Sequence, residues 1–184
     1  ANKFDNGQEV VELGNDLYKL FINTTGSIRI KAADNKILIS CLSYYAEYEG
    51  SEMHTISNVR VRIETDSTAI IEGNINKKAR VRIIVSAKSD DPEANFVVQT
   101  SYYDSTTVIR EALVADYNIP VTEVYNKNRK IDLERFHREY WLGKEGLKLG
   151  SGSRSLMIYH PNNISSLQLE AKKKIIVINL EFQF

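Results

Sequence analysis

The sequence predicts an all-β protein, an antiparallel two-sheet β-sandwich of about a dozen strands with little or no helix. Apolar residues recur at every second position from Val59 onward, and no segment has a convincing helical period. A period of two places successive side chains on opposite faces of a sheet, so each strand can bury one face. Two facing sheets are favoured because a single sheet of that many strands would curl or split.

The first quarter of the chain predicts short strands separated by turns rich in glycine, asparagine and aspartate. Strands are expected in residues 9–23, 27–33 and 36–42, with turns at Thr24–Gly26 and Asp34–Asn35. These turn residues accept the positive φ angles that tight hairpins require. Residues 43–56 have the least regular pattern and are expected to form a long surface connection.

The most regular segment, residues 57–87, predicts a three-stranded meander. Matching apolar residues across loops at 66–68 and 76–78 places Ile63 opposite Ile71, and Ile71 opposite Ile83. The other face then carries a charge ladder with polar flanks: Arg62–Glu72–Arg82, with Arg60, Asn74 and Arg80. Its arginines could hold an acidic glycan, but the carboxylate among them favours a surface that satisfies its own charges.

The rest of the chain predicts more strands of the same kind. They are expected at residues 96–103, 107–118, 121–125, 131–142, 147–149, 156–159, 167–171 and 174–182. Residues 1–8 are polar and expected to be loose, and residues 9–184 form a single β-sandwich domain. Because the final strand runs into Phe184, we expect this domain to be part of a longer protein.

Composition excludes several classes of function. Lys+Arg and Asp+Glu both number 24, so there is no basic excess of the kind that marks a nucleic-acid partner. Cys41 is the only cysteine and lies in an apolar run, which predicts a buried, inert thiol and no disulfide. No apolar stretch is long enough to span a bilayer, and no cofactor motif is present. The oligomeric state is left open.

A glycine-rich segment late in the chain holds the predicted binding residues. Residues 140–154 contain the only tryptophan but no Gly-Lys-Ser/Thr, so a phosphate-binding loop is not favoured. Its glycines could instead form a hairpin turn and a bulge, and its tryptophan could fill the core. Alternatively, aromatic faces stack on sugar rings while polar neighbours bind hydroxyls. The residues of this candidate carbohydrate site are Trp141, Tyr140, Arg154, His137, Glu139 and Tyr159.

The histidines give no clear catalytic or metal site. His54, His137 and His160 lie far apart in the sequence, without the spacing of a metal motif. Because His137 and Glu139 share one face of a predicted strand, the carboxylate could orient the imidazole for acid–base catalysis. The same pair is also typical of an ordinary polar strand face. No catalytic residue and no metal ligand is therefore predicted.

Two sets of segments resemble a known superfamily. One is the series Ile71–Gly73, Phe96–Tyr103 and Val108–Val114, and the other runs from Glu139–Gly143 through Gly150–Arg154 to Tyr159–Pro161. Together they resemble the β-supersandwich of the galactose-mutarotase-like superfamily, as found in N-terminal domains of bacterial glycan-active enzymes. The resemblance implies a non-catalytic sandwich that packs against, or lends a loop to, a catalytic domain. Mutarotases themselves use a set of histidine and glutamate residues in a cleft, and His54, His137 and His160 cannot be matched to that set, so the resemblance does not imply mutarotase activity.

The sequence therefore predicts a non-catalytic, carbohydrate-associated module of a larger exported glycan-active enzyme. Its partner would be a glycan or the neighbouring catalytic domain, and its location periplasmic or extracellular. The alternatives are a sugar epimerase or lyase on the same sandwich, and a purely structural or protein-contact domain. An exposed apolar patch around Phe182 and Phe184 would favour the last of these.

Overall fold

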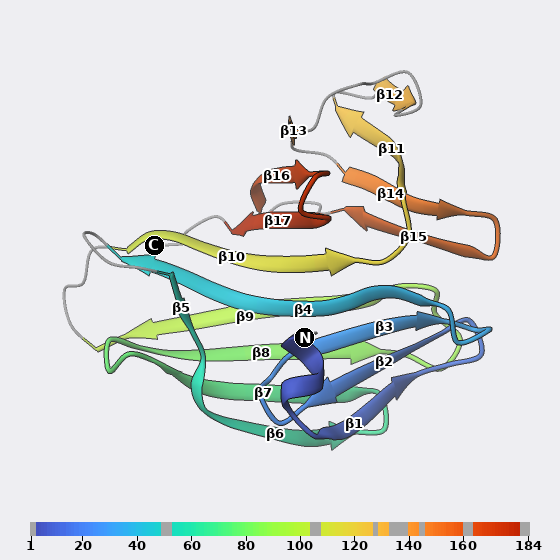
Figure 1. Cartoon of the computed structure of the whole chain (residues 1–184). Coiled ribbons are helices and arrows are strands. Elements are labelled where there is room, and N and C mark those ends of the chain that lie inside the picture. The colour runs from blue at the N-terminus through green and yellow to red at the C-terminus, as the bar shows by residue number, and fades with distance from the viewer. Residues whose placement is uncertain are drawn as a thin grey trace.

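A computed structural model describes residues 3–48, 53–103, 108–126, 129–132, 140–143, 146–159 and 164–180, some of them by their backbone alone. The chain is all-β, and its paired strands are antiparallel, which confirms the predicted fold class (Figure 1). Within these residues the only helical element is a short 3-10 turn, η1 (Lys3–Asn6). The strands divide among three sheets rather than the two expected from the sequence.

The largest sheet, here called the large sheet, contains nine strands. Its order is β1 (Glu9–Gly14), β2 (Tyr18–Asn23), β3 (Ile28–Ala32), β4 (Ile37–Tyr48), β10 (Val108–Tyr117), β17 (Ile175–Leu180), β16 (Ile164–Glu170) and β13 (Tyr140–Gly143). The short strand β5 (Met53–Thr55) pairs with β4 outside this path. Residues from both halves of the chain therefore build one sheet, with β4 and β10 at its centre.

Two four-stranded sheets complete the fold. The meander sheet contains β6 (Ser57–Thr65), β7 (Thr68–Ile75), β8 (Ala79–Ala87) and β9 (Ala94–Tyr102). The third sheet has the order β12 (Arg129–Asp132), β11 (Val121–Asn126), β14 (Gly146–Ser151) and β15 (Arg154–Tyr159). Figure 1 shows the meander sheet in the lower half of the view, together with β1–β4, and the third sheet in the upper half, together with β16 and β17.

The core lies between these layers and follows the alternation of the sequence. On β8, Val81, Ile83 and Val85 are buried, while Arg80 between the buried positions is exposed. The inner face of the meander sheet packs near β1, which contacts β6, β7 and β8. Removing this apolar surface from water contributes about 25 cal/mol per Å² buried, which is the main force holding the sheets together.

The meander pairs in a different register from the one predicted. Ile71 faces Ile83 and Glu72 faces Arg82 as expected, but β6 is displaced so that Val61 faces Ile71. The cause is the first turn, which has two residues between Thr65 and Thr68 rather than three, followed by a bulge. Because β6 is an edge strand, the prediction that Ile63 is buried opposite Ile71 is wrong, and its side chain is 60% exposed.

The segment predicted to be an irregular surface connection is largely regular strand. β4 continues to Tyr48, and Tyr44, Ala46 and Tyr48 all point into the core. Tyrosine is favoured in strands and can bury its ring while its hydroxyl finds a polar partner. The predicted burial of Cys41, on the same strand, is confirmed.

Part of the polar N-terminal segment packs against the large sheet. Phe4 in η1 is buried, and the guanidinium of Arg29 lies 4.3 Å from the centre of its ring. The side-chain amide of Asn23 donates to the Phe4 carbonyl at 2.6 Å. This segment is therefore more ordered than its composition predicts.

Candidate functional site

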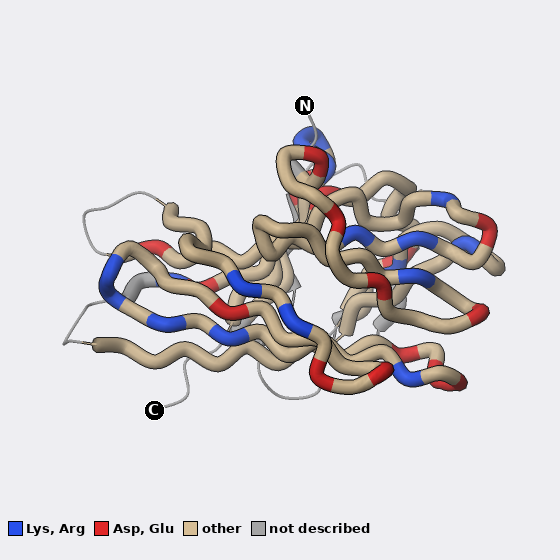
Figure 2. The backbone as a smooth tube through the Cα atoms, turned by 90° about the horizontal axis from the view of Figure 1, so that it is seen from below, with Lys and Arg blue, Asp and Glu red and all other residues tan. Residues whose placement is uncertain are grey.

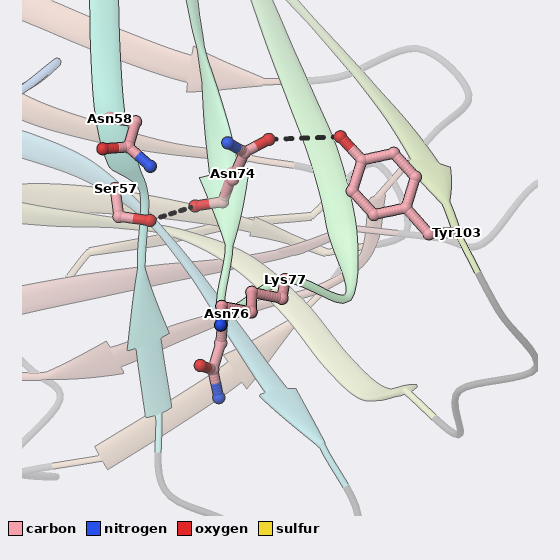
Figure 3. Close-up of a pocket in the computed structure, with 6 residues that line it drawn as sticks. All are labelled: Ser57, Asn58, Asn74, Asn76, Lys77 and Tyr103. Atoms are coloured by element: carbon pink, nitrogen blue, oxygen red, sulfur yellow. Dashed lines mark hydrogen bonds between the residues drawn. The ribbon is translucent and has the colours of Figure 1, made fainter.

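A polar groove lies at one end of the meander sheet. Its cavity measures about 400 Å³ and is lined by Ser57, Asn58, Asn74, Asn76, Lys77 and Tyr103 (Figure 3). These residues come from the start of β6, the end of β7, the β7–β8 turn and the residue after β9. The antiparallel meander brings the four segments together, because each hairpin returns the chain to the same end of the sheet.

Backbone conformation helps to shape the groove. Asn58 has a φ of 53°, and the pairing of β6 with β7 is irregular between Ser57 and Arg60. Asn76 and Lys77 have φ values of 40° and 59°, and the amide of Lys78 donates to the Ile75 carbonyl at 2.8 Å. Two successive positive φ angles are typical of a type I′ hairpin turn. The turn and the bulge therefore bring Asn58, Asn76 and Lys77 into the lining of the groove.

Asn74 is the centre of the groove. The Ser57 hydroxyl donates to its backbone carbonyl at 3.1 Å, and the Tyr103 hydroxyl donates to its Oδ1 at 3.2 Å. Figure 3 shows both bonds. The side-chain oxygen of Asn74 is turned toward Tyr103, and its side-chain nitrogen is turned away from Tyr103. Tyr103 is held in turn by its backbone amide, which donates to the Lys78 carbonyl at 3.0 Å.

Several polar groups of the groove remain available to a ligand. Among the described residues, the side-chain amides of Asn58 and Asn76 and the Lys77 ammonium make no hydrogen bond or ion pair. All three side chains are exposed, and the Tyr103 ring is 60% exposed. The groove therefore offers amide donors and acceptors, one cation and one aromatic face in a space of small-ligand size.

The groove continues into a row of arginines on the outer face of the meander sheet. Asn74 faces Ser57 on one side and Arg80 on the other. The next row along the strands is Arg60, Glu72, Arg82 and Gln99, and the row after it is Arg62, Ile70, Ile84 and Val97. Figure 2 views the molecule from this side and shows basic positions on neighbouring strands.

Glu72 is shared among three of these arginines. Its Oε1 lies 3.7 Å from Arg62 Nη2 and 3.5 Å from Arg82 Nε, and its Oε2 lies 3.4 Å from Arg80 Nη2. The predicted charge ladder is therefore present, although Arg60 and not Arg62 stands directly opposite Glu72. Side chains of this length also cover apolar surface, since Ile70 is fully buried on this outer face.

A second polar cluster lies on the inner side of the same sheet end. Glu111 on β10 is buried, and its Oε1 accepts hydrogen bonds from the Tyr44 hydroxyl at 2.6 Å and the Tyr102 hydroxyl at 2.9 Å. Tyr44 and Glu111 belong to the large sheet, whereas Tyr102 is the last residue of β9. This carboxyl group therefore joins the two sheets through one oxygen atom.

The tyrosines of this cluster are held in the neutral form. Burial, with the charge of the nearby Glu111 carboxylate, raises the pKa of Tyr48 to about 12. The same two causes, together with their hydrogen bonds to Glu111, raise the pKa of Tyr44 and of Tyr102 far above the ordinary value. The Tyr44 and Tyr102 hydroxyls therefore act as donors to Glu111 at neutral pH and not as bases.

Only two of the six predicted site residues have described side chains, and the structure does not bring them together. Arg154 and Tyr159 are the first and last residues of β15, about 17 Å apart along the strand. Arg154 forms an ion pair with Asp34 in the β3–β4 turn, and the Tyr159 hydroxyl donates to Glu93 before β9. Each links the third sheet to a neighbouring loop.

The other predicted residues lie outside the described part of the chain. His137 and Glu139 are not described, and Tyr140 and Trp141 are described only by the backbone of β13, which pairs with β16. His160, Phe182 and Phe184 also lie outside the described residues. The carbohydrate site at these positions stays a prediction.

The remaining histidine, His54, lies on β5 with its ring 5.5 Å from that of Tyr48. Among the described residues, no group of three or more histidine, cysteine, aspartate or glutamate side chains could hold a metal ion. The described residues also include no helix that is long and apolar enough to cross a membrane.

Comparison with known proteins identifies no relative: the chain matches no protein-family model, no curated protein and no solved structure. The resemblance to the galactose-mutarotase-like superfamily therefore stays a prediction. The groove and the surface around it are therefore the features of the molecule that bear on its function.

Sequence reasoning did not find this groove. Its residues are common turn and strand-end types, and they meet only because the start of β6 lies beside the ends of β7 and β9. The available signal was the concentration of asparagine at the ends of the meander strands, at positions 58, 74 and 76. Asparagine is ordinary in turns, which is why that signal pointed to turns alone.

Proposed function

We propose that this chain is a non-catalytic carbohydrate-binding module, with the polar groove of the meander sheet as its binding site. The observation that carries the proposal is that the unpaired side-chain amides of Asn58 and Asn76 line one groove with the exposed ring of Tyr103. Amides can donate to and accept from sugar hydroxyls, and an aromatic ring can contact the apolar face of a pyranose.

The chemistry of the groove supports binding rather than turnover. Its described side chains are amide, hydroxyl, ammonium and phenol groups, and none of them is a carboxylate or an imidazole. Glycosidic bond cleavage usually requires a pair of carboxylic acids at a defined separation. The alternative of a sugar epimerase or lyase depends on His137 or His160, which lie outside the described residues. Membership of a larger exported protein belongs to the same proposal and rests on the sequence alone.

A glycan array followed by calorimetric titration tests this proposal. The chain is expected to bind at least one glycan on an array that contains neutral and acidic oligosaccharides. Asn74→Ala should weaken that binding by about tenfold, because hydrogen bonds of this kind each contribute about 0.5–1.5 kcal/mol and the variant also releases Tyr103.

The matched control for this experiment is Asn95→Ala. Asn95 is an exposed asparagine on β9, opposite Ser86 at the other end of the meander sheet. Its substitution should leave the affinity unchanged. Absence of binding to every glycan on the array would refute the proposal, and equal loss in the two variants would place the site elsewhere.

A further inference from the structure

The arginine face next to the groove indicates which glycans the module takes. The strands of the meander sheet carry Arg60, Arg62, Arg80 and Arg82 on their outer face, against the carboxylates of Glu72 and Glu64. Lys77 adds a further positive charge at the groove. The chain as a whole has a net charge of zero, so this positive excess is a local property of one face.

The ion pairs of Glu72 leave much of this positive charge without a neutralising partner among the described residues. Three guanidinium groups share one carboxylate at 3.4 to 3.7 Å, and each guanidinium has five N–H donors. Among the described residues, Arg60 makes no ion pair or hydrogen bond at all. The side chains of Arg62 and Arg80 are 51% and 59% exposed, so their free donors face solvent.

Glu72 also orients the guanidinium groups before any ligand binds. A planar guanidinium that is already held in place loses less freedom when it binds a second carboxylate or a sulfate. The geometry of the sheet sets the spacing, with neighbouring strands about 4.8 Å apart and successive outward residues about 6.7 Å apart. The arginines of β6 and β8 therefore form two rows about 10 Å apart, with the groove at the end of both rows.

We infer that the ligand is an acidic polysaccharide whose carboxylate or sulfate groups bind the outer-face arginines while one of its sugar units occupies the groove. The inference rests on the proposed function and adds the charge of the ligand. It is favoured over nucleic acid because the chain has no overall basic excess and because Glu72 lies in the middle of the face. Anionic groups spaced along a glycan can bind the exposed guanidinium donors of Arg60, Arg62 and Arg80 that Glu72 does not use.

The test compares polygalacturonate with its fully methyl-esterified form, which has the same sugar backbone without the charges. Calorimetric titration of the whole chain should show binding to the acid form, with affinity falling as salt is raised, and binding at least about tenfold weaker to the ester. A sulfated glycan, heparin, is titrated beside them to compare the two kinds of anionic group.

Three variants make the test specific for this face. Arg60→Gln combined with Arg62→Gln should weaken binding of the acid form by about tenfold or more. Glu72→Gln should strengthen it several-fold, because removing the one carboxylate that pairs with these arginines among the described residues outweighs the loss of the contacts that orient them. Lys172→Gln removes an equally exposed charge in the β16–β17 turn and should change nothing. Melting temperatures of all variants show whether each is folded.

The outcomes separate this inference from the proposed function. Equal binding of polygalacturonate and its ester, lost in Asn74→Ala but unaffected by the arginine variants, would overturn the inference and leave the carbohydrate-binding proposal intact. Absence of binding to any glycan would overturn both. Binding of a DNA duplex that depends on the same arginines, without binding of either anionic glycan, would make this face a nucleic-acid site and overturn the inference as well.

Discussion

The hydrogen bond between Tyr44 and Glu111 is the most direct test of how the large sheet and the meander sheet are joined. Both residues are buried, with 2% and 7% of their surfaces exposed, and the distance from Tyr44 Oη to Glu111 Oε1 is 2.6 Å. Tyr44→Phe keeps the ring and removes the donor. A hydrogen bond to a charged group contributes about 1.5–3 kcal/mol, and we expect that loss in the free energy of unfolding.

That loss converts into a measurable shift in melting temperature. For a chain of this length, each kcal/mol lowers the melting temperature by about 2–4 °C, which gives a drop of about 3–12 °C for Tyr44→Phe. Circular dichroism during heating measures the shift, and urea titration measures the free energy directly. An unchanged or increased stability would refute the view that this bond holds the layers together.

Tyr102→Phe is the matched comparison for that experiment. Tyr102 donates to the same oxygen at 2.9 Å, but its side chain is partly exposed, with 38% of its surface accessible. Water can therefore replace part of what the variant loses, so the expected cost is smaller, about 0.5–1.5 kcal/mol. Because both hydroxyls bind one oxygen atom, the two losses should not add in the double variant.

Three further predictions concern other parts of the fold. Stability should fall as pH rises above about 10, because the unfolded chain loses the Tyr44 and Tyr48 protons that the folded chain retains. The free energy of unfolding should decrease by about 1.4 kcal/mol per pH unit for each tyrosine. Near-ultraviolet titration of the folded protein should show these two phenolates forming at a higher pH than in the unfolded chain. Gly73→Ala should cost about 1–3 kcal/mol in urea unfolding, since its added carbon would lie 2.1 Å from Ile56 Cγ2. Asn15→Ala should cost about 1–3 kcal/mol in the same assay, since its amide donates to two carbonyls of the β8–β9 loop, both at 2.8 Å; no change would contradict either role.

The sequence predicted which face of β8 is buried, and it did so from alternation alone. Val81, Ile83 and Val85 are buried as expected, and Arg80 and Arg82 alternate with them on the outer face. This part of the prediction is robust because hydrophobic burial acts on each strand separately and depends only on its own period of two.

The pairing of β6 with β7 could not be predicted in the same way. A displacement of two residues keeps every side chain on its correct face, so the apolar pattern does not distinguish Ile63 opposite Ile71 from Val61 opposite Ile71. The choice depends on the backbone of the Thr65–Thr68 turn and on the bulge near Asn58. The turn and the bulge each depend on small differences in free energy, which the amino-acid composition does not reveal.

The long inward-facing strand β4 was missed for a related reason. The segment around Tyr44 and Tyr48 has the composition of a polar, aromatic loop. The residues that explain its burial, Glu111 and Tyr102, lie elsewhere in the chain. A buried tyrosine is stable only where its hydroxyl finds a partner. For Tyr44 that partner is Glu111, which lies 67 residues away in the chain and which the local sequence pattern therefore does not indicate.

The two polar clusters at this end of the molecule are connected through consecutive residues of one strand end. Tyr102 points inward and binds Glu111, whereas Tyr103 binds Asn74 on the outer side, in the groove. The Lys78 carbonyl accepts the Tyr103 amide, and the Lys78 ammonium lies 5.7 Å from the centre of the Tyr48 ring. The groove is therefore attached to the buried junction between two sheets and not only to a surface hairpin. Because a site on a rigid support loses little freedom on binding, this attachment helps binding by holding in place Tyr103, Asn74 and the backbone that carries the exposed amides.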